Sequence, residues 1–358
     1  MPIPTEPIGS IPRPPELLAA MRDHAAGDIS NESFHSVQES ALKDTIQRLQ
    51  ETGSSVITDG EQTKPSFATY PLIGLQNLAP DGVTIPFADG HTRQLPRLTK
   101  GPFRYGVQAA TYLKAAQHYT RQPIKQAVIS ASALSLLYPQ SGLAGYSRED
   151  FLEDLIEEAA KDIRVCLEAG AASVQIDFTE ARLSLKLDPS GGLLNSFVEL
   201  NNRVLSKFSD EERKRIGVHT CPGGDQDSTH SADVDYARLL PALFRMDVGR
   251  FYVQLSSEAD RKRVLGTLRK LVKTGQMLFV GVIDPINRRV ESVEAVRDRV
   301  LEAAEFIPLE MLGTTDDCGF SPFADDTSTS RDTAFAKIRS RVEGTAQASD
   351  ALGLKLAG

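Results

Sequence analysis

A histidine and a cysteine two residues apart, His219 and Cys221, are the residues of this 358-residue chain best suited to chemistry. They end the stretch RIGVHTC, which is rich in strand-forming residues. Side chains two apart on a strand point to the same face, so both can reach one ion. A third soft ligand, Cys318, follows an apolar run far downstream. Two thiolates and one imidazole form the ligand set of a catalytic zinc site with one open position, so the sequence predicts a Zn²⁺ cofactor and zinc-activated thiol chemistry.

The alternative is that these cysteines are packing residues. A free buried cysteine commonly behaves as a small hydrophobic side chain, and a single His-x-Cys motif is weak evidence for a metal. The positions of the three residues in the fold therefore decide between the two interpretations.

Short apolar runs alternate with segments of helical periodicity along the whole chain, which predicts an α/β fold, a single (β/α)8 TIM barrel covering residues 1–358. We expect a hairpin-like excursion at 62–122, between strands two and three, and an insertion with a helix at 179–214, between strands four and five. The eight predicted strands are Pro4–Ser10, Ser54–Glu61, Lys125–Ser132, Ala171–Asp177, Arg215–Cys221, Arg250–Ser256, Met277–Asp284 and the stretch around Thr314.

The carboxyl ends of barrel strands are where catalytic residues gather. His219, Cys221 and Cys318 all fall at such ends, on strands five and eight. Packing cysteines would show no such preference. This placement favours the metal site over the alternative of core thiols.

Composition narrows the partners. A net charge of −8 argues against binding nucleic acid, and three cysteines suggest a reducing compartment. Apolar runs are too short to span a membrane, and the first residues lack the features of a signal peptide. We expect a soluble cytoplasmic enzyme, with homo-oligomerisation open, whose partners are a small thiol and a small electrophile.

Five motifs carry a family resemblance. IGSIPRP, TDGEQTKPSF, VQIDF, VHTC and TTDDCGF occur in the order and at the spacing found in the catalytic barrel of cobalamin-independent methionine synthase. HTCPGGDQDSTHSADVDYA and LGTTDDCGFSPFADDTSTSRDTAFAKIR more closely resemble the epoxyalkane:coenzyme M transferases, also called 2-hydroxypropyl-coenzyme M lyases. The resemblance implies a barrel of the uroporphyrinogen decarboxylase and methionine synthase type that performs zinc-dependent alkyl transfer to a thiol.

Four departures from the methionine synthase pattern argue against methyl-folate as the donor. Gln254 stands where that family has a glutamate ligand, and Ile286 stands where it has a histidine for the folate half-reaction. Phe178 replaces the carboxylate after Asp177, and the long N-terminal half of full-length methionine synthases does not precede this barrel.

The resemblance and the strand ends together nominate further site residues. A fourth metal ligand could come from Gln254, Glu258 or Asp317. Glu61 matches a glutamate that contacts the amino-acid substrate in methionine synthases, and Asp177 could orient a hydroxyl or an amine. The predicted substrate-binding residues are Ser10, Arg13, Glu61, Lys64, Arg104, Asp177 and Arg182, whose cations would suit an anionic thiol such as coenzyme M. The candidate proton donors are His230, Tyr105 and Tyr138.

The leading functional hypothesis is thiolate opening of an epoxide to a hydroxyalkyl thioether, which in reverse is a C–S lyase reaction. The alternative within the same fold is a folate-independent methyltransferase acting on homocysteine or another thiol. An alternative of another class is a barrel that binds zinc or a thiol without turnover. Intact His219, Cys221 and Cys318 count against this last alternative.

Overall fold

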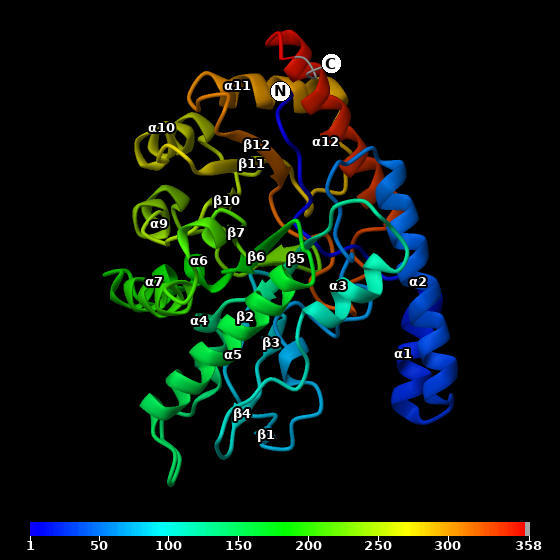
Figure 1. Cartoon of the computed structure of the whole chain (residues 1–358), viewed down its shortest axis with the longest axis vertical. Coiled ribbons are helices and arrows are strands. Elements are labelled where there is room, and N and C mark those ends of the chain that lie inside the picture. Colours follow the sequence, from blue (N-terminus) through cyan, green and yellow to red (C-terminus); the bar gives the residue numbers. More distant parts are fainter. Residues whose placement is uncertain (355–358) are drawn as a thin grey trace.

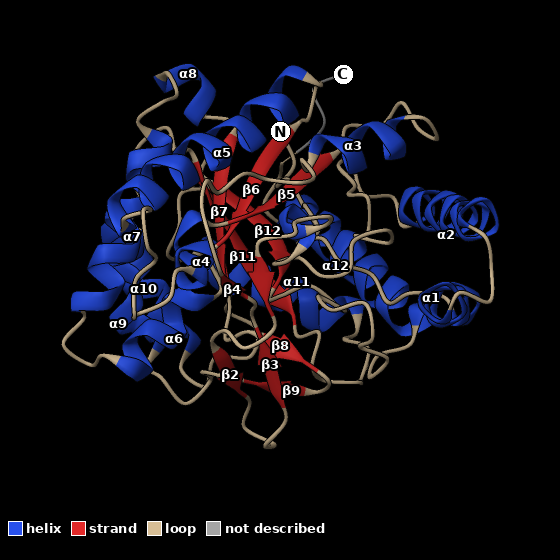
Figure 2. Ribbon diagram, turned by 90° about the horizontal axis from the view of Figure 1, so that it is seen from below, coloured by secondary structure: helices blue, strands red, loops and turns tan. Residues whose placement is uncertain are grey.

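The computed structural model describes residues 1–354 and is built around one parallel β-sheet (Figures 1 and 2). The sheet has six strands in the order β12-β11-β10-β7-β6-β5, and every neighbouring pair is parallel. Its strands are β5 (Lys125–Ile129), β6 (Ser173–Asp177), β7 (Ile216–Thr220), β10 (Arg250–Val253), β11 (Met277–Ile283) and β12 (Leu312–Asp316). The predicted α/β class with a parallel sheet is confirmed.

The first two predicted strands contribute one bridge each. Thr5 pairs with Thr314 of β12, and Ile57 pairs with Ile124 next to β5. Pro4 directly precedes Thr5, and Pro7 follows it by two residues. Proline cannot donate a hydrogen bond to a β-ladder, which limits the pairing of this segment. The two segments meet where the amide of Ile11 donates to the carbonyl oxygen of Gly60 at 2.9 Å. Eight continuous strands forming a closed barrel therefore remain a prediction.

Helices follow the strands and surround the sheet (Figure 2). Many begin at a serine whose side chain accepts an N–H of the first turn, as Ser147 does for α5. The helices are α1 (Pro15–Ala26), α2 (Asn31–Glu51), α3 (Ala110–Gln117), α4 (Ala131–Leu134), α5 (Arg148–Glu168), α6 (Glu180–Leu187), α7 (Gly192–Leu205), α8 (Asp210–Arg213), α9 (Tyr236–Leu243), α10 (Arg261–Leu271), α11 (Val293–Ala304) and α12 (Arg331–Ala351), with short 3₁₀ turns η1 (Tyr70–Leu72) and η2 (Ser135–Leu137).

Two boundaries differ from prediction for local reasons. The strand expected at Lys125–Ser132 ends at Ile129 because Ser130 caps α4, accepting the amide of Ala133 at 3.1 Å. The segment 179–214 contains α6 as well as α7, since an apolar face recurs at helical spacing before Asp188.

Residues 62–122 form small antiparallel pairs and a helix rather than part of the sheet. β1 (Leu78–Ala79) pairs with β4 (Arg97–Leu98), and β2 (Thr84–Pro86) pairs with β3 (Thr92–Gln94). The β2–β3 hairpin lies against a second hairpin, β8 (Gly224–Asp225) with β9 (Ser228–Thr229), which directly follows the metal-ligand motif of β7 (Figure 2). Ala88 donates its amide to the carbonyl oxygen of Thr229 at 2.9 Å. Residues 62–122 therefore reach the carboxyl end of the sheet. The predicted bounds of this excursion and of the insertion at 179–214 stay a prediction.

Candidate metal centre

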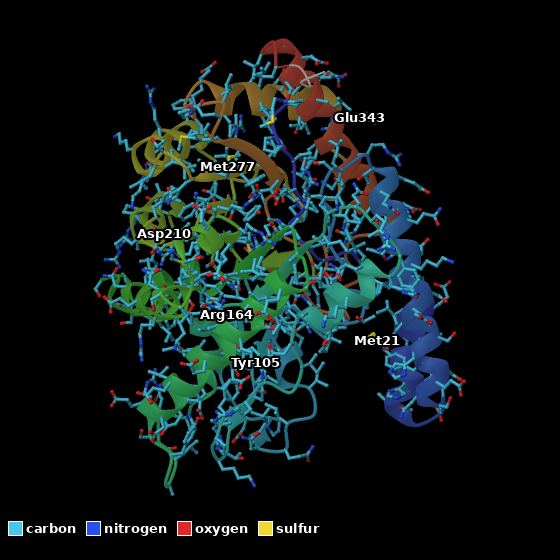
Figure 3. The ribbon with its side chains drawn as sticks, in the orientation of Figure 1. Met21, Tyr105, Arg164, Asp210, Met277 and Glu343 are labelled. Atoms are coloured by element: carbon cyan, nitrogen blue, oxygen red, sulfur yellow. The ribbon has the colours of Figure 1, made fainter. Side chains whose placement is uncertain are left out.

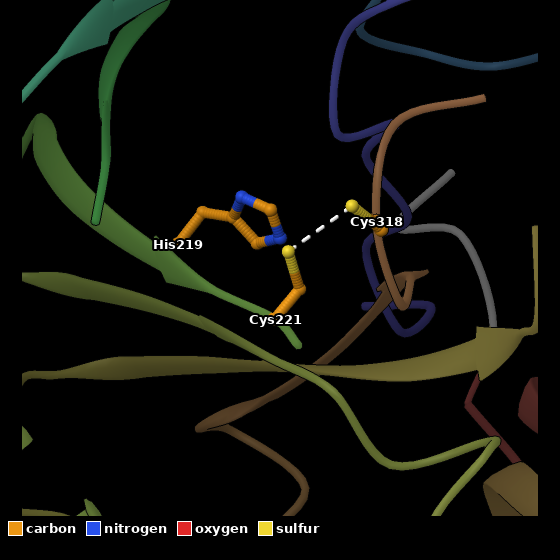
Figure 4. A group of neighbouring side chains, drawn as sticks. All are labelled: His219, Cys221 and Cys318. Carbon is orange, nitrogen blue, oxygen red and sulfur yellow. Dashed lines mark hydrogen bonds between the residues drawn. The ribbon is translucent and has the colours of Figure 1, made fainter. Parts of the chain in front are cut away.

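His219, Cys221 and Cys318 converge at the carboxyl end of the sheet (Figure 4). One ligand atom from each lies within 4.8 Å of the other two, and all three residues are buried. His219 is on β7, Cys221 follows that strand, and Cys318 follows β12. Two strands, β10 and β11, separate β7 from β12 in the sheet. The convergence therefore depends on the curvature of the whole sheet, and the sequence predicted it only through the shared strand ends.

Asp177, at the end of β6, fixes the orientation of the histidine ring. Its Oδ1 accepts from Nδ1 of His219 at 3.2 Å and from Nε2 of Gln175 at 2.7 Å. Burial opposes protonation of His219, but the hydrogen bond and the charge of Asp177 outweigh it and raise the pKa of the imidazole. Nε2 lies 3.3 Å from the carbonyl oxygen of Asp317. Because Asp177 holds Nδ1, Nε2 is the nitrogen that a metal would take, which is the usual carboxylate–histidine–metal arrangement.

The two thiols lie 3.1 Å apart and form no disulfide (Figure 4). Their hydrogen bond lowers the pKa of Cys318 and raises that of Cys221 well above its ordinary value, with burial adding to the second shift. The amide of Gly223 also donates to Sγ of Cys221, at 3.4 Å. Two soft sulfur donors and one oriented imidazole nitrogen fit a zinc ion. The third cysteine, Cys166, is buried in α5 and packs as a small hydrophobic side chain would.

The three candidates for a fourth ligand use their polar atoms elsewhere. Gln254 accepts from Arg182 at 3.0 Å and donates to Ser257 at 2.7 Å. Glu258 forms an ion pair with Arg182 at 2.8 Å. The Asp317 carboxylate accepts the amides of residues 255, 256 and 257 at 2.7–2.9 Å. Among the described residues, only the His219, Cys221 and Cys318 ligands group into a possible metal site, so a fourth coordination position is left for water or substrate.

One cavity borders both the metal ligands and a set of polar groups. Ser10, Glu61 and Asp177 line it together with His219 and Cys318. Most of the rest of its wall is apolar and comes from Ile8, Phe67, Ile85, Phe87, Pro322 and Phe323, and Arg93, Thr179 and His230 also line it. We call this space the metal cavity. It places two carboxylates and a hydroxyl beside two of the candidate metal ligands.

Glu61 is held rigidly in the metal cavity. Its backbone adopts φ 54°, a left-handed conformation that is costly for a residue other than glycine. Arg13 donates to its carbonyl oxygen at 2.6 Å, and Nζ of Lys64 donates to its carboxylate at 3.1 Å. Burial raises the pKa of Glu61, although the charge of Lys64 opposes this shift. A strained backbone that fixes a carboxylate beside a metal site is typical of a functional residue.

Close packing joins Ser10 to the Cys318 loop. The amide of Ser321 donates to Oγ of Ser10 at 3.2 Å. A Cβ atom at position 319 would lie 2.2 Å from that oxygen, so a larger residue there would displace the Ser10 hydroxyl. Ser10 therefore contacts the loop that carries one metal ligand.

Four of the remaining predicted residues lie outside the metal cavity. Arg182 contacts Gln254 and Glu258 but does not line the metal cavity. Arg104 is half-exposed and pairs with Asp154. Tyr105 lies beside α5 (Figure 3), and Tyr138 donates to the carbonyl oxygen of Tyr146. None of these four side chains borders the cavity.

His230 is the one proton-donor candidate that lines the metal cavity. It is buried, and burial together with the charges of Lys186 and Arg182 lowers its pKa to about 4. Its ring packs on Gly223, where an added Cβ would lie 1.8 Å from Nε2. A neutral imidazole here can accept a hydrogen bond but is a weak acid near pH 7.

The β2–β3 hairpin is a part of the site that the sequence analysis did not identify. Ile85, Phe87 and Arg93 from this hairpin line the metal cavity. Arg93 holds the hairpin in place through ion pairs with Asp225 at 2.5 Å and Asp325 at 2.9 Å. The available signal was the β-branched and aromatic alternation in VTIPF, which predicts a hairpin but not its position over the site.

Comparison with known proteins agrees with this geometry. Residues 3–343 match the model of the family described as cobalamin-independent synthase, catalytic domain. The chain belongs to this family. It is therefore grouped with enzymes, and the superfamily resemblance seen in the motifs is confirmed.

Individual relatives are similar over most of this chain, and a solved structure shares its fold. The methionine synthase of Saccharolobus solfataricus is 25% identical over 96% of this chain and 94% of its own, and that of Pyrococcus furiosus is 23% identical over 88% and 86%. A B12-independent methionine synthase from a Shewanella species, in complex with selenomethionine, superposes with a TM-score of 0.75 at 19% identity, covering 98% of this chain and 99% of the other. The narrower resemblance to epoxyalkane:coenzyme M transferases stays a prediction.

No helix in residues 1–354 is long and apolar enough to cross a membrane.

Proposed function

We propose that this protein transfers a methyl group to the thiol of homocysteine or a closely related amino-acid thiol, at a zinc ion held by His219, Cys221 and Cys318. The observation that carries the proposal is the metal cavity, which is bordered by two of the metal ligands and by Ser10, Glu61 and Asp177. The relatives named methionine synthase support the same reaction.

Zinc bound at this site would keep a coordinated substrate thiol deprotonated and nucleophilic. The protein's own residues supply orientation. Asp177 holds the His219 ring, and Glu61 offers a carboxylate to the substrate from a rigid backbone. Apolar walls exclude water from the reacting sulfur.

The charges around the metal cavity favour an amino-acid thiol over a sulfonate such as coenzyme M. Glu61 and Asp177 both line it, and a substrate ammonium group would be attracted to these carboxylates. The nearby cations are already engaged: Lys64 with Glu61, and Arg93 with Asp225 and Asp325. A sulfonate would have to compete for them.

The donor is not a folate in this proposal. Ile286 occupies the position of the histidine that serves the folate half-reaction in methionine synthases, and its side chain lies beside Gly224, where an added Cβ would be 3.2 Å away. An alkyl side chain cannot transfer a proton. Phe178, which replaces a carboxylate, is fully buried in the core. A small donor that needs neither group is consistent with both changes.

Opening of an epoxide by the bound thiolate is the second candidate. It is favoured by the uncharged side chain of Gln254, which leaves the site with two cysteine ligands and one histidine and no carboxylate ligand. Such a site is less electron-rich than one with a glutamate ligand. A zinc-binding protein without turnover is the third candidate and predicts no product from any pair of substrates.

The test is a product screen with the zinc-loaded protein. Homocysteine, cysteine, glutathione and coenzyme M would each be combined with methyl donors and with small epoxides, and thioether products would be measured by mass spectrometry. The proposal predicts methionine from homocysteine. Hydroxyalkyl thioethers from coenzyme M, with no methylated product, would replace it with the second candidate.

A matched substrate pair tests the role of Glu61. Homocysteine and its analogue without the amino group, 4-mercaptobutanoic acid, share the thiol and the carboxylate. We expect the wild-type protein to prefer homocysteine at least tenfold in kcat/KM, and Glu61→Gln to lose most of that preference while keeping its zinc. An unchanged preference would show that Glu61 does not recognise the ammonium group.

A further inference from the structure

A second cavity adjoins the metal cavity and contains a buried carboxylate that the proposed function leaves unused. The two cavities share six lining residues, which are Phe67, Ile85, Arg93, Thr179, His230 and Phe323. Glu180, the first residue of α6, lines only the second cavity. Most of the remaining wall is apolar and comes from Leu95, Ile129, Ala133, Leu134, Leu136 and Leu183. We call this space the Glu180 cavity.

Glu180 is 5% exposed, and half of its carboxylate has no partner. Ser130 and Ser132 donate to Oε1 at 2.6 and 2.5 Å. Oε2 is buried without a hydrogen bond in the described part of the chain. Burial raises the pKa of Glu180 to about 7, although both serines oppose this shift. An unpaired buried carboxylate oxygen is costly, so a role in binding a ligand explains it better than packing does.

No lysine, arginine or histidine in residues 1–354 forms an ion pair with Glu180. Arg93, which lines the same cavity, is committed to Asp225 and Asp325. Glu180 therefore lines this cavity without a counter-ion among the described residues.

The aromatic lining suits a cation that cannot donate hydrogen bonds. Phe67 and Phe323 lie edge to face with centroids 5.7 Å apart, and both line the two cavities. The guanidinium of Arg93 already lies over Phe323, 4.2 Å from its centroid, so Phe67 is the ring of this pair left for a ligand. His230 also lines both and contacts Phe87 at 5.5 Å. Aromatic rings beside a carboxylate attract methylated onium groups through cation–π contacts and charge. A lysine-like ammonium would instead need three hydrogen-bond acceptors, and most of this wall is apolar.

We propose that the Glu180 cavity binds the methyl donor and that this donor is an onium cation, a methylsulfonium compound, with Glu180 as its counter-ion. The proposal rests on methyl transfer as the proposed function. Thr179 and His230, which border both cavities, mark where the donor methyl group would approach the thiol.

The reaction balances without a further co-reactant. The thiolate sulfur of the acceptor forms a bond to the methyl carbon, and the bond from that carbon to the sulfonium sulfur breaks. The electron pair stays on the departing sulfur, which becomes a neutral thioether. The thiol proton passes to solvent. Loss of positive charge weakens attraction to Glu180 and favours release of the demethylated donor.

Binding of a minimal probe tests the cation site separately from catalysis. Calorimetry would compare trimethylsulfonium with dimethyl sulfoxide, a neutral pyramidal molecule of similar size, on the zinc-loaded protein. We expect the wild-type protein to prefer trimethylsulfonium, and Glu180→Gln to weaken its binding at least tenfold. Glu158→Gln removes a buried carboxylate outside the cavity and is the matched control. Equal affinity for both probes, or unchanged binding in Glu180→Gln, would overturn the proposal.

A second variant guards against misfolding of Glu180→Gln, which zinc content and the melting temperature would reveal. Phe67→Leu keeps an apolar side chain and removes the ring. We expect this variant to bind trimethylsulfonium severalfold more weakly than the wild type and to bind dimethyl sulfoxide equally well. Trimethylsulfonium binding as tight as in the wild type would contradict the aromatic contribution.

Turnover then separates the two proposals. Methylation of homocysteine by other donors, with Glu180→Gln as active as wild type, would refute the onium site alone. Binding of trimethylsulfonium that depends on Glu180, without methylation of any thiol, would refute the proposed function and leave a cation site.

Discussion

Asp317 provides a sharp test because it was a candidate metal ligand and the structure gives it another role. Oδ1 accepts the amides of Leu255 and Ser256 at 2.9 and 2.8 Å, and Oδ2 accepts the amide and the hydroxyl of Ser257 at 2.7 Å each. Asp317 therefore fastens the loop after β10 to the segment that carries Cys318. We predict that Asp317→Asn destabilises the protein even when no metal is present.

The magnitude follows from the four contacts. Each oxygen of the Asp317 carboxylate accepts two hydrogen bonds. An asparagine side chain has only one oxygen, so in either orientation its NH₂ group would face two hydrogen-bond donors. Losing charge-assisted hydrogen bonds and leaving a buried donor unsatisfied costs about 2–4 kcal/mol in the free energy of unfolding. A solvent-facing aspartate such as Asp298 should change it by less than about 0.5 kcal/mol, which makes Asp298→Asn the control.

The assay is urea unfolding of chelator-treated wild type, Asp317→Asn and Asp298→Asn at pH 8. If Asp317 were a metal ligand instead, Asp317→Asn would lose zinc, but its metal-free form would unfold like the wild type. That second pattern would refute the role derived from the structure.

Three further predictions concern the loops around the cavities. Gly223→Ala should lower turnover more than tenfold and destabilise the protein by about 1–3 kcal/mol, because residue 223 has φ 71° and a Cβ would collide with His230. Enzyme kinetics and the melting temperature would measure the two effects. A variant that behaves like the wild type would contradict the close packing of His230 on residue 223. Arg93→Ala should release the β2–β3 hairpin and increase hydrogen exchange at 84–94, while equal protection would mean that the ion pairs do not hold it. Burial lowers the pKa of His230 to about 4, so this side chain stays neutral in the folded protein while the unfolded chain already takes up a proton near pH 6.5. The free energy of unfolding of the metal-free protein should therefore fall by up to about 3 kcal/mol as pH falls from 6.5 to 4. His230→Gln should reduce that loss in urea titrations at several pH values, and an identical pH slope would contradict the burial argument.

The sequence predicted the elements whose signals are local. Strands β5, β6, β7, β10, β11 and β12 all appear within the predicted apolar runs, because β-branched residues buried on both faces leave a clear pattern. The first two predicted strands reduce to single bridges at Thr5 and Ile57, since pairing depends on partners far away in the sequence. The order of strand ends was enough to group the three candidate metal ligands.

Residues that act through tertiary contacts were harder to predict. Nothing in the local pattern places Arg93 over the cavity or gives it Asp225 as a partner, 132 residues away. Glu180 follows Asp177 by three residues and could have been noticed at a strand end, but its unpaired oxygen is visible only once Ser130 and Ser132 are in place. Gln254 and Glu258 were reasonable ligand candidates by position, and Arg182 engages both of them.

Metal analysis combined with spectroscopy of the cobalt-substituted protein tests the central claim most directly. We expect about one zinc ion per chain, sulfur-to-cobalt charge-transfer bands that weaken in Cys221→Ser and in Cys318→Ser, and no such change in Cys166→Ser. Purified protein that binds no zinc, or bands that survive both substitutions at residues 221 and 318, would contradict the account.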